Sequence, residues 1–520
     1  MQSLKGNDFS CNEELQEIRQ MTSTVRYRPQ NMIVLEKDLS RQESVPLLEA
    51  MKKYRDKKCT PFDVPGHKYG RGLPELSDYF GEDALAYDFN SMKPLDILSN
   101  PTSVIMEAES LLAEAYGADS GFFVVNGTSS AVKSMIMAAC RPNDKILVPR
   151  NAHKSVLNGL IGSGAIPIYL QPEFDLELGM FHGVNTEYVK TMIDKNLNAK
   201  AILLINPTYY GAVSQLKEIA KYAHSKNMVV LVDEAHGAHL SFHGDLPPSG
   251  IECGADMVAI SMHKTGGSLT QSSALLSRNE RVKPQLIRKY LNLNGTTSAS
   301  YLLMGSLDAA RRNLAINGYE AVNRAIEIAR YGRNKINEIE GLYALGSELI
   351  GKRGVYGFDE TKLVINTKGI GLTGFELYDT LRDRYNIQVE LGDTYNLLAI
   401  VSLGDTYESM EVLIEALKDI GNNKRRIPQQ ITHPKNVGTL EVAMCPREAF
   451  YAETEKVLFK QSVGRISGES IMAYPPGIPI VTPGEVITEE VVKYALHLKK
   501  NKALITDIQD ISLRFIDVIK

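Results

Sequence analysis

The sequence of 520 residues has no tryptophan, few cysteines, and no apolar run near the ~18–20 residues of a membrane-spanning helix. The N-terminal residues also lack the apolar core of a signal peptide. The net charge of −4 gives no general basic surface for nucleic acid. The five cysteines are far apart and form no C-x-x-C pair, which favours reduced thiols over disulfides or a zinc site: Cys11, Cys59, Cys140, Cys253 and Cys445. These absences predict a cytoplasmic protein whose partners include neither nucleic acid nor a membrane.

The length and composition indicate an ordinary globular protein of two or three domains, since 43% of the residues are hydrophobic and 23% are charged. Changes in pattern along the chain suggest where the boundaries fall. We expect an N-terminal arm with a helical segment (1–60), a large domain (61–310), a small α/β domain (311–425) and a C-terminal domain (426–520). A polar, basic linker is expected over Gly421–Gln430.

Between residues 117 and 278, short apolar runs alternate with helical patterns, which is typical of a mostly parallel sheet. The predicted strands are Phe122–Val125, Lys145–Val148, Ile166–Leu170, Ala201–Ile205, Met228–Val232, Met257–Ile260 and Ser273–Leu276. Helices are predicted over Val45–Lys57, Ser129–Ala139, Ser214–His224, Leu302–Ile339 and Glu489–Lys500, and further strands over Leu363–Asn366, Ile387–Leu391 and Leu397–Val401. The predicted fold class is α/β, with a mostly parallel seven-stranded sheet covered by helices and smaller C-terminal α/β domains.

Lys264 follows the predicted strand Met257–Ile260 and is itself followed by glycines and hydroxyl residues as far as Gln271. A lysine at this place is either an ordinary surface residue or an amine held at the carboxyl end of the sheet. Open α/β sheets bind their ligands at that end. The residue alone does not decide between the two.

Other polar side chains follow predicted strands in the same way. The cluster Asn126–Ser130 precedes an apolar helix, whose free N–H groups and dipole suit an anion such as a phosphate, although helix capping alone would explain one of the hydroxyls. His153 follows the next strand and is either a packed imidazole or a functional one. We expect both at the same edge as Lys264.

Asp233–His236 comes directly after a third strand and spells a helicase box. A nucleotide-hydrolysing protein would also need a phosphate-binding loop upstream. The nearest match, Gly346–Lys352, lies downstream and is followed by Arg353, which has no hydroxyl for a metal ion. A metal site built from His236, His239 and His243 is the other alternative, but their spacing matches no known ligand pattern, so we predict no metal.

A phosphate-type loop, an imidazole, a carboxylate and a lysine at one sheet edge together match what pyridoxal 5'-phosphate requires. Its phosphate needs helix N–H groups and hydroxyls, its ring a flat partner, its pyridine nitrogen a carboxylate, and its aldehyde an amine. Four independent requirements met in one order are a stronger signal than any single motif.

The segment Ser261–Ser273 resembles the cofactor-attachment segment of the bacterial ornithine/lysine/arginine decarboxylases, which are pyridoxal-phosphate enzymes of the aspartate-aminotransferase fold (fold type I). The resemblance covers about residues 45–500 and includes Pro65–Lys68, Asn206–Gly211, Asp233–Gly237, Thr296–Tyr301, Tyr474–Pro479 and Pro483–Glu485. The segment before Pro65 is shorter than the N-terminal wing domain of the longer members. The resemblance therefore implies the short, wingless type.

The resemblance implies that Lys264 attaches the cofactor, Asp233 pairs with its pyridine nitrogen and His153 stacks on its ring, these three being the catalytic residues. The full set of implied cofactor-binding residues is Gly127, Thr128, Ser129, His153, Asp233, His236, Ser261, His263, Lys264, Thr297 and Ser298. Thr297 or Ser298 would reach the phosphate in a neighbouring subunit, which implies a homodimer or higher homo-oligomer with its active site at the subunit interface.

The implied reaction is α-decarboxylation of a small basic amino acid, with Lys264 or a nearby histidine as the proton donor. A cationic substrate tail needs an acidic partner, for which Glu469 and Glu485 are candidates, and His67 is a further candidate for substrate binding. Arginine is the expected substrate, with lysine and ornithine as alternatives. Transamination on the same scaffold and a non-catalytic homologue are more remote, the first because no arginine in the small domain stands out as a carboxylate ligand.

Overall fold

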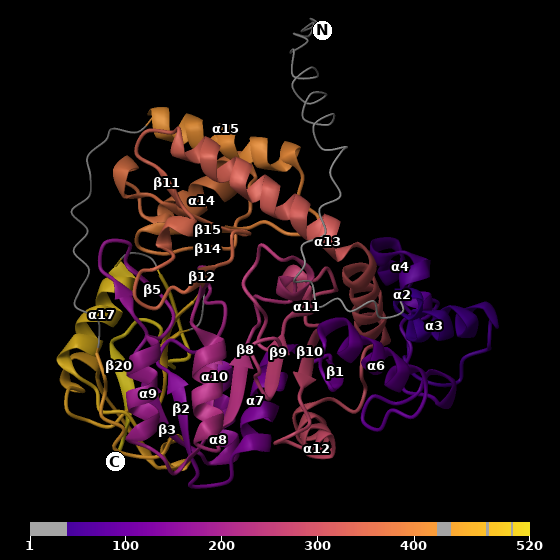
Figure 1. The fold of residues 1–520 in the computed structure, drawn as a ribbon, viewed down its shortest axis with the longest axis horizontal. Helices are drawn as coiled ribbons and strands as arrows, with labels where there is room; N and C mark the ends of the chain where they lie inside the picture. Colours follow the sequence, from indigo (N-terminus) through magenta and orange to yellow (C-terminus); the bar gives the residue numbers. More distant parts are fainter. Residues whose placement is uncertain (1–38, 424–437, 475–477, 501–502) are drawn as a thin grey trace, which may run out of the picture. The chain divides into compact units, whose positions relative to one another are not determined.

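The computed structural model describes residues 39–423, 438–474, 478–500 and 503–520 (Figure 1). The chain divides into two compact units, residues 1–37 and 38–520, and all described residues belong to the second. None of the helices in these ranges is long and apolar enough to cross a membrane.

A seven-stranded sheet in the order β1-β10-β9-β8-β6-β2-β3 forms the centre of this unit. Strands β9, β8, β6, β2 and β3 pair in parallel, whereas β10 is antiparallel to both β1 and β9. The sequence-predicted strands and the mostly parallel sheet are thus confirmed. The strands are β1 (Ser120–Val124), β2 (Lys145–Pro149), β3 (Ile166–Leu170), β6 (Ala199–Ile205), β8 (Val229–Asp233), β9 (Met257–Ile260) and β10 (Ser273–Ser277).

Helices cover both faces of the sheet because its strands are apolar on both sides. Val230 and Val232 of β8 pack with the helices of one face, and Leu231 between them packs with those of the other. One face carries α6 (Val104–Tyr116), α9 (Thr186–Asp194), α10 (Leu216–Ser225) and the start of α13 (Tyr301–Asn337). The other carries α7 (Gly127–Ala139), α8 (Lys154–Ser163) and α12 (Pro284–Asn294). The predicted helices of this region are therefore confirmed, each within a few residues.

The N-terminal described segment packs on α13. Asp308 of that helix accepts a hydrogen bond from the backbone N–H of Leu47 (3.0 Å), and Arg311 donates to the carbonyl of Gln42 (2.7 Å). The short helices here are α2 (Leu39–Gln42), α3 (Pro46–Asp56), α4 (Pro74–Phe80) and α5 (Glu82–Ala86). The helix expected over Val45–Lys57 is present as α3.

The long helix α13 leads to a second sheet of four antiparallel strands in the order β11-β13-β15-β14, shown in orange in Figure 1. Its elements are β11 (Tyr343–Leu345), β13 (Lys362–Asn366), β14 (Leu391–Gly392), β15 (Asn396–Ile400), α14 (Gly374–Tyr385) and α15 (Tyr407–Asn423). The strand expected over Ile387–Leu391 is largely wrong, because only Leu391 enters the ladder. Residues 387–390 instead lead from the end of α14, at the left-handed Asn386 (φ 56°), to the edge of the sheet.

A short ladder joins the two sheet regions. Strand β7 (Ala212–Val213), which follows β6, pairs with β12 (Gly357–Phe358), which precedes β13. The backbone N–H of Asp359 also donates to the carbonyl of Gly211 (2.8 Å). The loop between β6 and β7 is therefore fastened to the second sheet.

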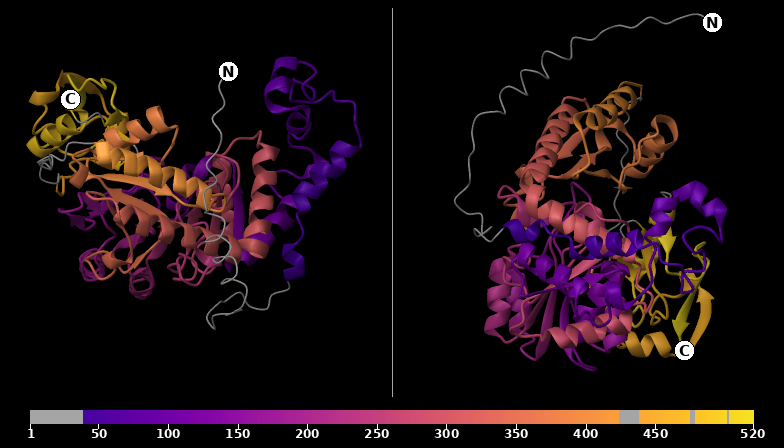
Figure 2. Two further views of the ribbon diagram at one scale, coloured as in Figure 1. Left: turned by 90° about the horizontal axis from the view of Figure 1, so that it is seen from above. Right: turned by 90° about the vertical axis from the view of Figure 1, so that its right-hand side faces the viewer.

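The C-terminal elements lie beside the large sheet, as Figures 1 and 2 show in yellow. Helix α16 packs on α8, where the Arg447 side chain donates to the carbonyl of Ile161 (2.7 Å). The elements are α16 (Pro446–Tyr451), β16 (Thr454–Leu458), β17 (Ile471–Tyr474), β18 (Ile478–Val481), α17 (Glu489–Lys500), β19 (Leu504–Thr506) and β20 (Phe515–Ile519). Helix α17 matches its prediction. Of the expected linker, residues 421–423 end α15 and residues 424–430 lie outside the described ranges, as do Cys11 and Pro475–Gly477. The four-part domain division stays a prediction.

Candidate active site

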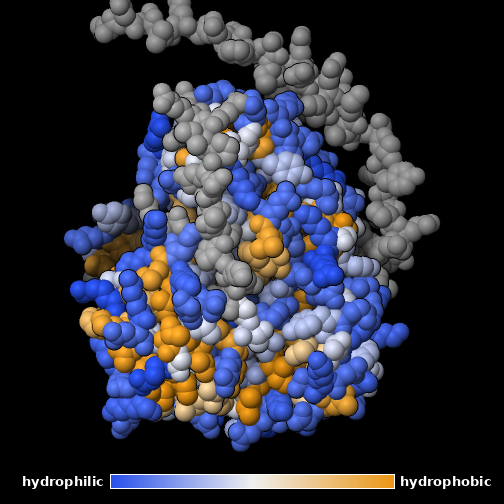
Figure 3. All heavy atoms as spheres, turned by 90° about the vertical axis from the view of Figure 1, so that its left-hand side faces the viewer, coloured by the Kyte–Doolittle hydropathy of each residue, from blue (hydrophilic) through white to orange (hydrophobic). Residues whose placement is uncertain are grey.

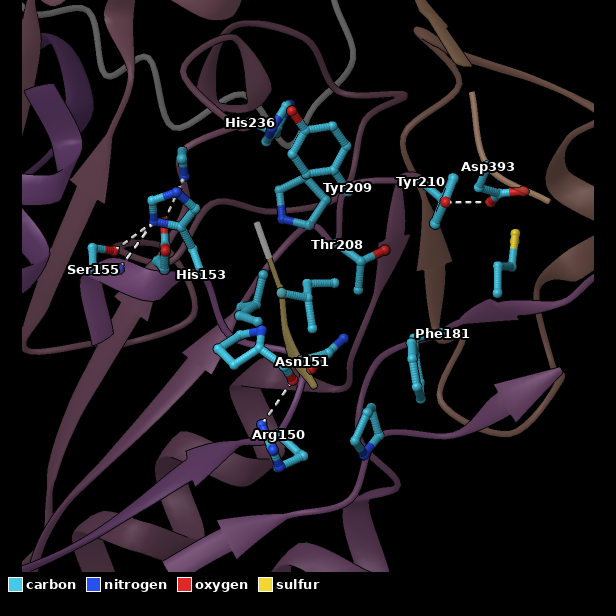
Figure 4. A pocket seen from close by; sticks show the side chains of 18 of the residues that line it. Arg150, Asn151, His153, Ser155, Phe181, Thr208, Tyr209, Tyr210, His236 and Asp393 are labelled. Atoms are coloured by element: carbon cyan, nitrogen blue, oxygen red, sulfur yellow. Dashed lines mark hydrogen bonds between the residues drawn. The ribbon is translucent and has the colours of Figure 1, made fainter. Parts of the chain in front are cut away.

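A cavity of about 510 Å³ lies at the carboxyl ends of the parallel strands (Figure 4). Its wall combines residues from the large sheet, from the second sheet near β14 and from the C-terminal elements. Sequence-predicted residues that line it are Gly127, Thr128, Ser129, His153, Asp233, His236, Ser261, His263 and Lys264. The topology thus brings these strand ends together, and their catalytic and cofactor-binding roles stay predictions.

Lys264 lies in α11 (Met262–Thr265), the single helical turn after β9. Its Nζ is 3.0 Å from Nε2 of His236 and 5.4 Å from the ring centre of Tyr209. Burial lowers the pKa of Lys264, although the carboxylates of Asp233 and Glu390 oppose this shift. The amine is therefore easier to deprotonate than a surface lysine, as a nucleophilic amine requires.

His236 follows β8 and is stacked at an angle on Tyr209, with 4.3 Å between the ring centres (Figure 4). Burial lowers its pKa well below the usual range, and the nearby charges of Lys264 and Lys362 add to the effect. The ring is consequently neutral, and its Nε2 accepts from the Lys264 ammonium. Its Nδ1 is buried without a hydrogen-bond partner among the described residues.

Asp233 ends β8 and is only 6% exposed. One carboxylate oxygen accepts the backbone N–H of Ala235 (3.2 Å). Burial raises the pKa of Asp233, while the Lys264 charge and the Ala235 hydrogen bond counteract it. A buried carboxylate with spare acceptor capacity suits a positively charged N–H donor.

The N-terminus of α7 faces the same cavity. Thr128 Oγ1 is hydrogen-bonded to the hydroxyls of Ser261 and Ser273, the latter at 2.8 Å. Asn126 makes no side-chain cap bond with the helix, and a Cβ added to Gly127 (φ +73°) would meet no atom within 4 Å. Open space, hydroxyls and first-turn N–H groups together form a cradle for an anion.

Two further histidines at this edge are held by local hydrogen bonds. His263 Nδ1 donates to the carbonyl of Ser272 (2.8 Å), and burial lowers its pKa. His153 caps α8, since its Nδ1 accepts the backbone N–H of Ser155 (3.2 Å). Burial, together with the positive charges of Lys264 and Lys154, lowers the pKa of His153 to about 4. Both rings are neutral at physiological pH.

This shift predicts how stability depends on pH. An unfolded histidine takes up its proton near pH 6.5 and the folded His153 only near 4, so the unfolded state gains protons as pH falls through this window. As the pH falls from about 6.5 to 4, the free energy of unfolding of the cofactor-free protein should therefore decrease by up to about 3 kcal/mol because of His153. His153→Asn keeps a capping side chain that does not titrate. Urea unfolding at pH 7.5 and pH 4.5 should show a smaller loss for the variant than for the wild type; equal losses would contradict the shift.

The other sequence-predicted residues lie elsewhere. Thr297 and Ser298 are exposed in the loop before α13. His67 contacts Asp88 (3.1 Å) through Nε2 and accepts the N–H of Gly70 (3.1 Å) through Nδ1. In the part of the chain that the structure describes, Thr297, Ser298 and His67 are all absent from the cavity lining.

The two acids expected to bind the substrate are also outside the cavity lining. Glu469 accepts the backbone N–H groups of Gln509 (2.7 Å) and Asp517 (2.8 Å) in the C-terminal region. Glu485 is 1% exposed and pairs with Arg150 (2.9 Å). In this chain both carboxylates have structural partners, so the structure does not bring them to Lys264.

Sequence reasoning missed two acids of the second sheet region that do line the cavity, Glu390 and Asp393. Glu390 accepts from the hydroxyl of Tyr209 (2.7 Å), and Asp393 accepts from that of Tyr210 (Figure 4). The only sequence signal was two acids within a short apolar stretch, which resembles a strand edge.

A buried polar group, which we call the Asp359 cluster, lies behind this wall and consists of His239, Asp359, Thr361 and Lys362. His239 Nε2 is 3.3 Å from Asp359, and Lys362 Nζ is 3.6 Å from the same carboxylate. The side chains of Asp359 and Lys362 are both fully buried. Burial alone would raise the pKa of Asp359, but the Lys362 charge and the contacts from His239 and Thr361 hold it well below its usual range.

The histidines considered as metal ligands have separate partners. His236 contacts Lys264, His239 contacts Asp359, and His243 stacks on Tyr319 with 4.7 Å between ring centres. Among the residues that the structure describes, no group of three histidine, cysteine or acidic side chains is placed to hold a metal ion.

Comparison with known proteins places the chain in a family. The Orn/Lys/Arg decarboxylase major domain matches residues 45–409, and the C-terminal domain of the same family matches residues 429–505. The chain is 44% identical over 484 residues to an arginine decarboxylase of Bacillus subtilis, covering 92% of this chain and 98% of that protein. It is 45% identical over 488 residues to an arginine decarboxylase of Halalkalibacterium halodurans, covering 93% and 99%.

A solved lysine decarboxylase from Francisella novicida has the same fold, with a TM-score of 0.80 at 22% identity over 92% of this chain and 82% of that one. The expected resemblance and fold type are therefore confirmed. The chain is an enzyme of the Orn/Lys/Arg decarboxylase family.

Proposed function

We propose that this enzyme removes the α-carboxylate of L-arginine with pyridoxal phosphate as its cofactor, giving agmatine and carbon dioxide. The observation that carries the proposal is the buried Lys264 amine, which lies in one cavity with the Asp233 carboxylate and the anion cradle of Thr128. Arginine is favoured over lysine and ornithine because the two relatives above, which match over nearly their whole lengths, are arginine decarboxylases.

The cavity residues fit this cofactor. Lys264 would attach the aldehyde carbon, Asp233 has acceptor capacity for a protonated ring nitrogen, and His236 Nδ1 is a buried polar atom that still needs a partner. The open space at Gly127 and the hydroxyls of Thr128 and Ser261 would take the phosphate. When bound, pyridoxal phosphate supplies a conjugated ring that takes up the electron pair left by the departing carboxylate.

The side chains of this chain would control the proton and the water. Lys264 Nζ, held 3.0 Å from the neutral His236, can carry a proton and return it to the substrate α-carbon. Asp233, which lies beside that amine, would pair with the ring nitrogen and orient the ring. The burial of Asp233 and His236 lowers the dielectric around the amine, which strengthens the charge interactions in this part of the cavity.

We also propose that the enzyme works in the cytoplasm as a homodimer. Large apolar side chains are exposed between residues 62 and 80, including Phe62 (95%) and Tyr79 (86%). Hydrophobic residues also gather on the lower half of the face in Figure 3, which is the side of α17 and β20 in Figure 1. Such exposure is unusual for a monomer and is relieved by contact with a second copy.

The substrate is tested by incubating the protein, loaded with pyridoxal phosphate, with arginine, lysine and ornithine in turn. Carbon dioxide release and the amine product are measured, together with 2-oxo acid formation. We expect agmatine from arginine with the highest kcat/KM of the three. A higher value for lysine or ornithine would replace arginine as the substrate, and 2-oxo acid without carbon dioxide would contradict decarboxylation.

A further inference from the structure

Three acidic side chains occur among the described residues that line the cavity, namely Asp233, Glu390 and Asp393. A cationic substrate tail taken into this partly buried space needs a carboxylate with free acceptor capacity, because an unpaired buried charge is costly. Asp233 lies at the end of β8 next to Lys264, where its carboxylate would accept the hydrogen bond of the cofactor ring nitrogen. The choice is therefore between the two acids of the second sheet region.

Asp393 already has a full set of donors. One oxygen accepts the backbone N–H groups of Tyr395 and Asn396 (both 2.7 Å). The other accepts from the Tyr210 hydroxyl and from Nδ2 of Asn396 (3.1 Å). A guanidinium could pair with Asp393 only by displacing one of these donors, so this carboxylate holds the loop and is not available.

Glu390 has the free hydrogen-bond acceptor capacity that Asp393 lacks. Its Oε1 accepts from the hydroxyl of Tyr209 (2.7 Å), and its Oε2 has no donor within the described ranges. The residue is half-buried, so its charge is only partly screened by solvent. The bond to Tyr209 also fixes the side chain, which reduces the entropy lost when a ligand binds.

We propose that Glu390 is the specificity-determining residue of this site and pairs with the positively charged tail of the substrate. The inference rests on the proposed decarboxylation of a basic amino acid and adds which group recognises it. The carboxylate accepts hydrogen bonds from a guanidinium or an ammonium and forms an ion pair with it, whereas an uncharged tail of the same shape can donate hydrogen bonds but forms no ion pair. Citrulline is the matching probe, since its ureido group replaces the guanidinium without changing the size of the tail.

A competing role for Glu390 is to balance the positive charge of Lys264, whose pKa it raises. The two roles predict different results. A tail-binding carboxylate discriminates between charged and uncharged ligands. A carboxylate that acts only on Lys264 affects all substrates equally.

The experiment uses wild type, Glu390→Gln and the control Glu415→Gln, whose side chain is exposed on α15. Each holoenzyme is titrated calorimetrically with agmatine and with N-carbamoylputrescine, in which a neutral ureido group replaces the guanidinium of agmatine, and is assayed with arginine in the presence of citrulline. For Glu390→Gln we expect the Kd of agmatine and the KM of arginine to rise by about 10- to 100-fold, as for loss of a hydrogen bond to a charged group. The values for the two ligands with a neutral ureido tail should stay within about twofold, and the control should match wild type.

Equal losses for ligands with a charged tail and ligands with a neutral tail, or no loss for either, would overturn the proposal. Glu390→Asp serves as a second variant if the glutamine variant fails to fold, and it should retain the preference for agmatine because it retains the charge. Loss of that preference in a folded Glu390→Asp enzyme would likewise count against tail binding. A wild-type holoenzyme that releases no carbon dioxide from any of the three basic amino acids would refute the proposed function instead, which separates the two failures.

Discussion

Replacement of Lys264 by alanine should abolish covalent attachment of pyridoxal phosphate and lower kcat for carbon dioxide release by about 10⁴-fold or more, as when other covalent catalytic groups are removed. The amine is buried beside Asp233 and His236, and no other described lysine lines the cavity. Borohydride reduction followed by peptide mass spectrometry locates the attachment site, and steady-state assays give kcat.

Lys221→Ala is the matched control, because that lysine is exposed on α10 at a distance from the cavity lining. The control should retain the cofactor adduct and the wild-type rate. An adduct on any other lysine, or turnover by Lys264→Ala close to that of wild type, would contradict the role of Lys264 as the residue that attaches the cofactor.

Replacement of Asp359 by asparagine should destabilise the protein by about 3–5 kcal/mol, because it leaves the Lys362 ammonium buried without a counter-charge. The asparagine has nearly the same shape, so packing is preserved and the loss is electrostatic. Urea unfolding followed by tyrosine fluorescence measures the change.

The double variant Asp359→Asn, Lys362→Met provides the decisive comparison. Methionine fills the volume of the lysine stem without its charge, so stability should return to within about 1.5 kcal/mol of wild type. If the double variant is as unstable as the single one, the loss comes from the hydrogen bonds of Thr361 and His239 to Asp359 rather than from an unpaired charge.

The large sheet could be predicted from sequence because its strands are short apolar runs that are buried on both faces. Strand direction could not, since the apolar pattern of β10 is the same whether it runs parallel or antiparallel to β9. The site residues on the large sheet could be found for a topological reason. Carboxyl ends of parallel strands meet at one edge, so the sequence predicts that Thr128, His153 and Asp233 lie together with Lys264.

The remainder of the wall could not be predicted, because it depends on contacts between distant parts of the chain. Glu390 is 181 residues from its partner Tyr209 and reaches it only because a second sheet docks there. The prediction of Glu469 and Glu485 rests only on their charge within a Pro-rich segment. Charge alone does not reveal that Arg150 and backbone N–H groups already occupy these carboxylates.

The short β7–β12 ladder has a consequence for how the enzyme responds to its ligands. It fastens the loop that carries Tyr209 to the second sheet, and Glu390, just before β14 of that sheet, accepts a hydrogen bond from the Tyr209 hydroxyl. The cavity wall is thus complete only when the second sheet is docked, so the free energy of docking is also the free energy of completing the wall. By reciprocity, any ligand that binds only the completed wall must strengthen that docking, and any change that loosens the docking must weaken the ligand by the same factor.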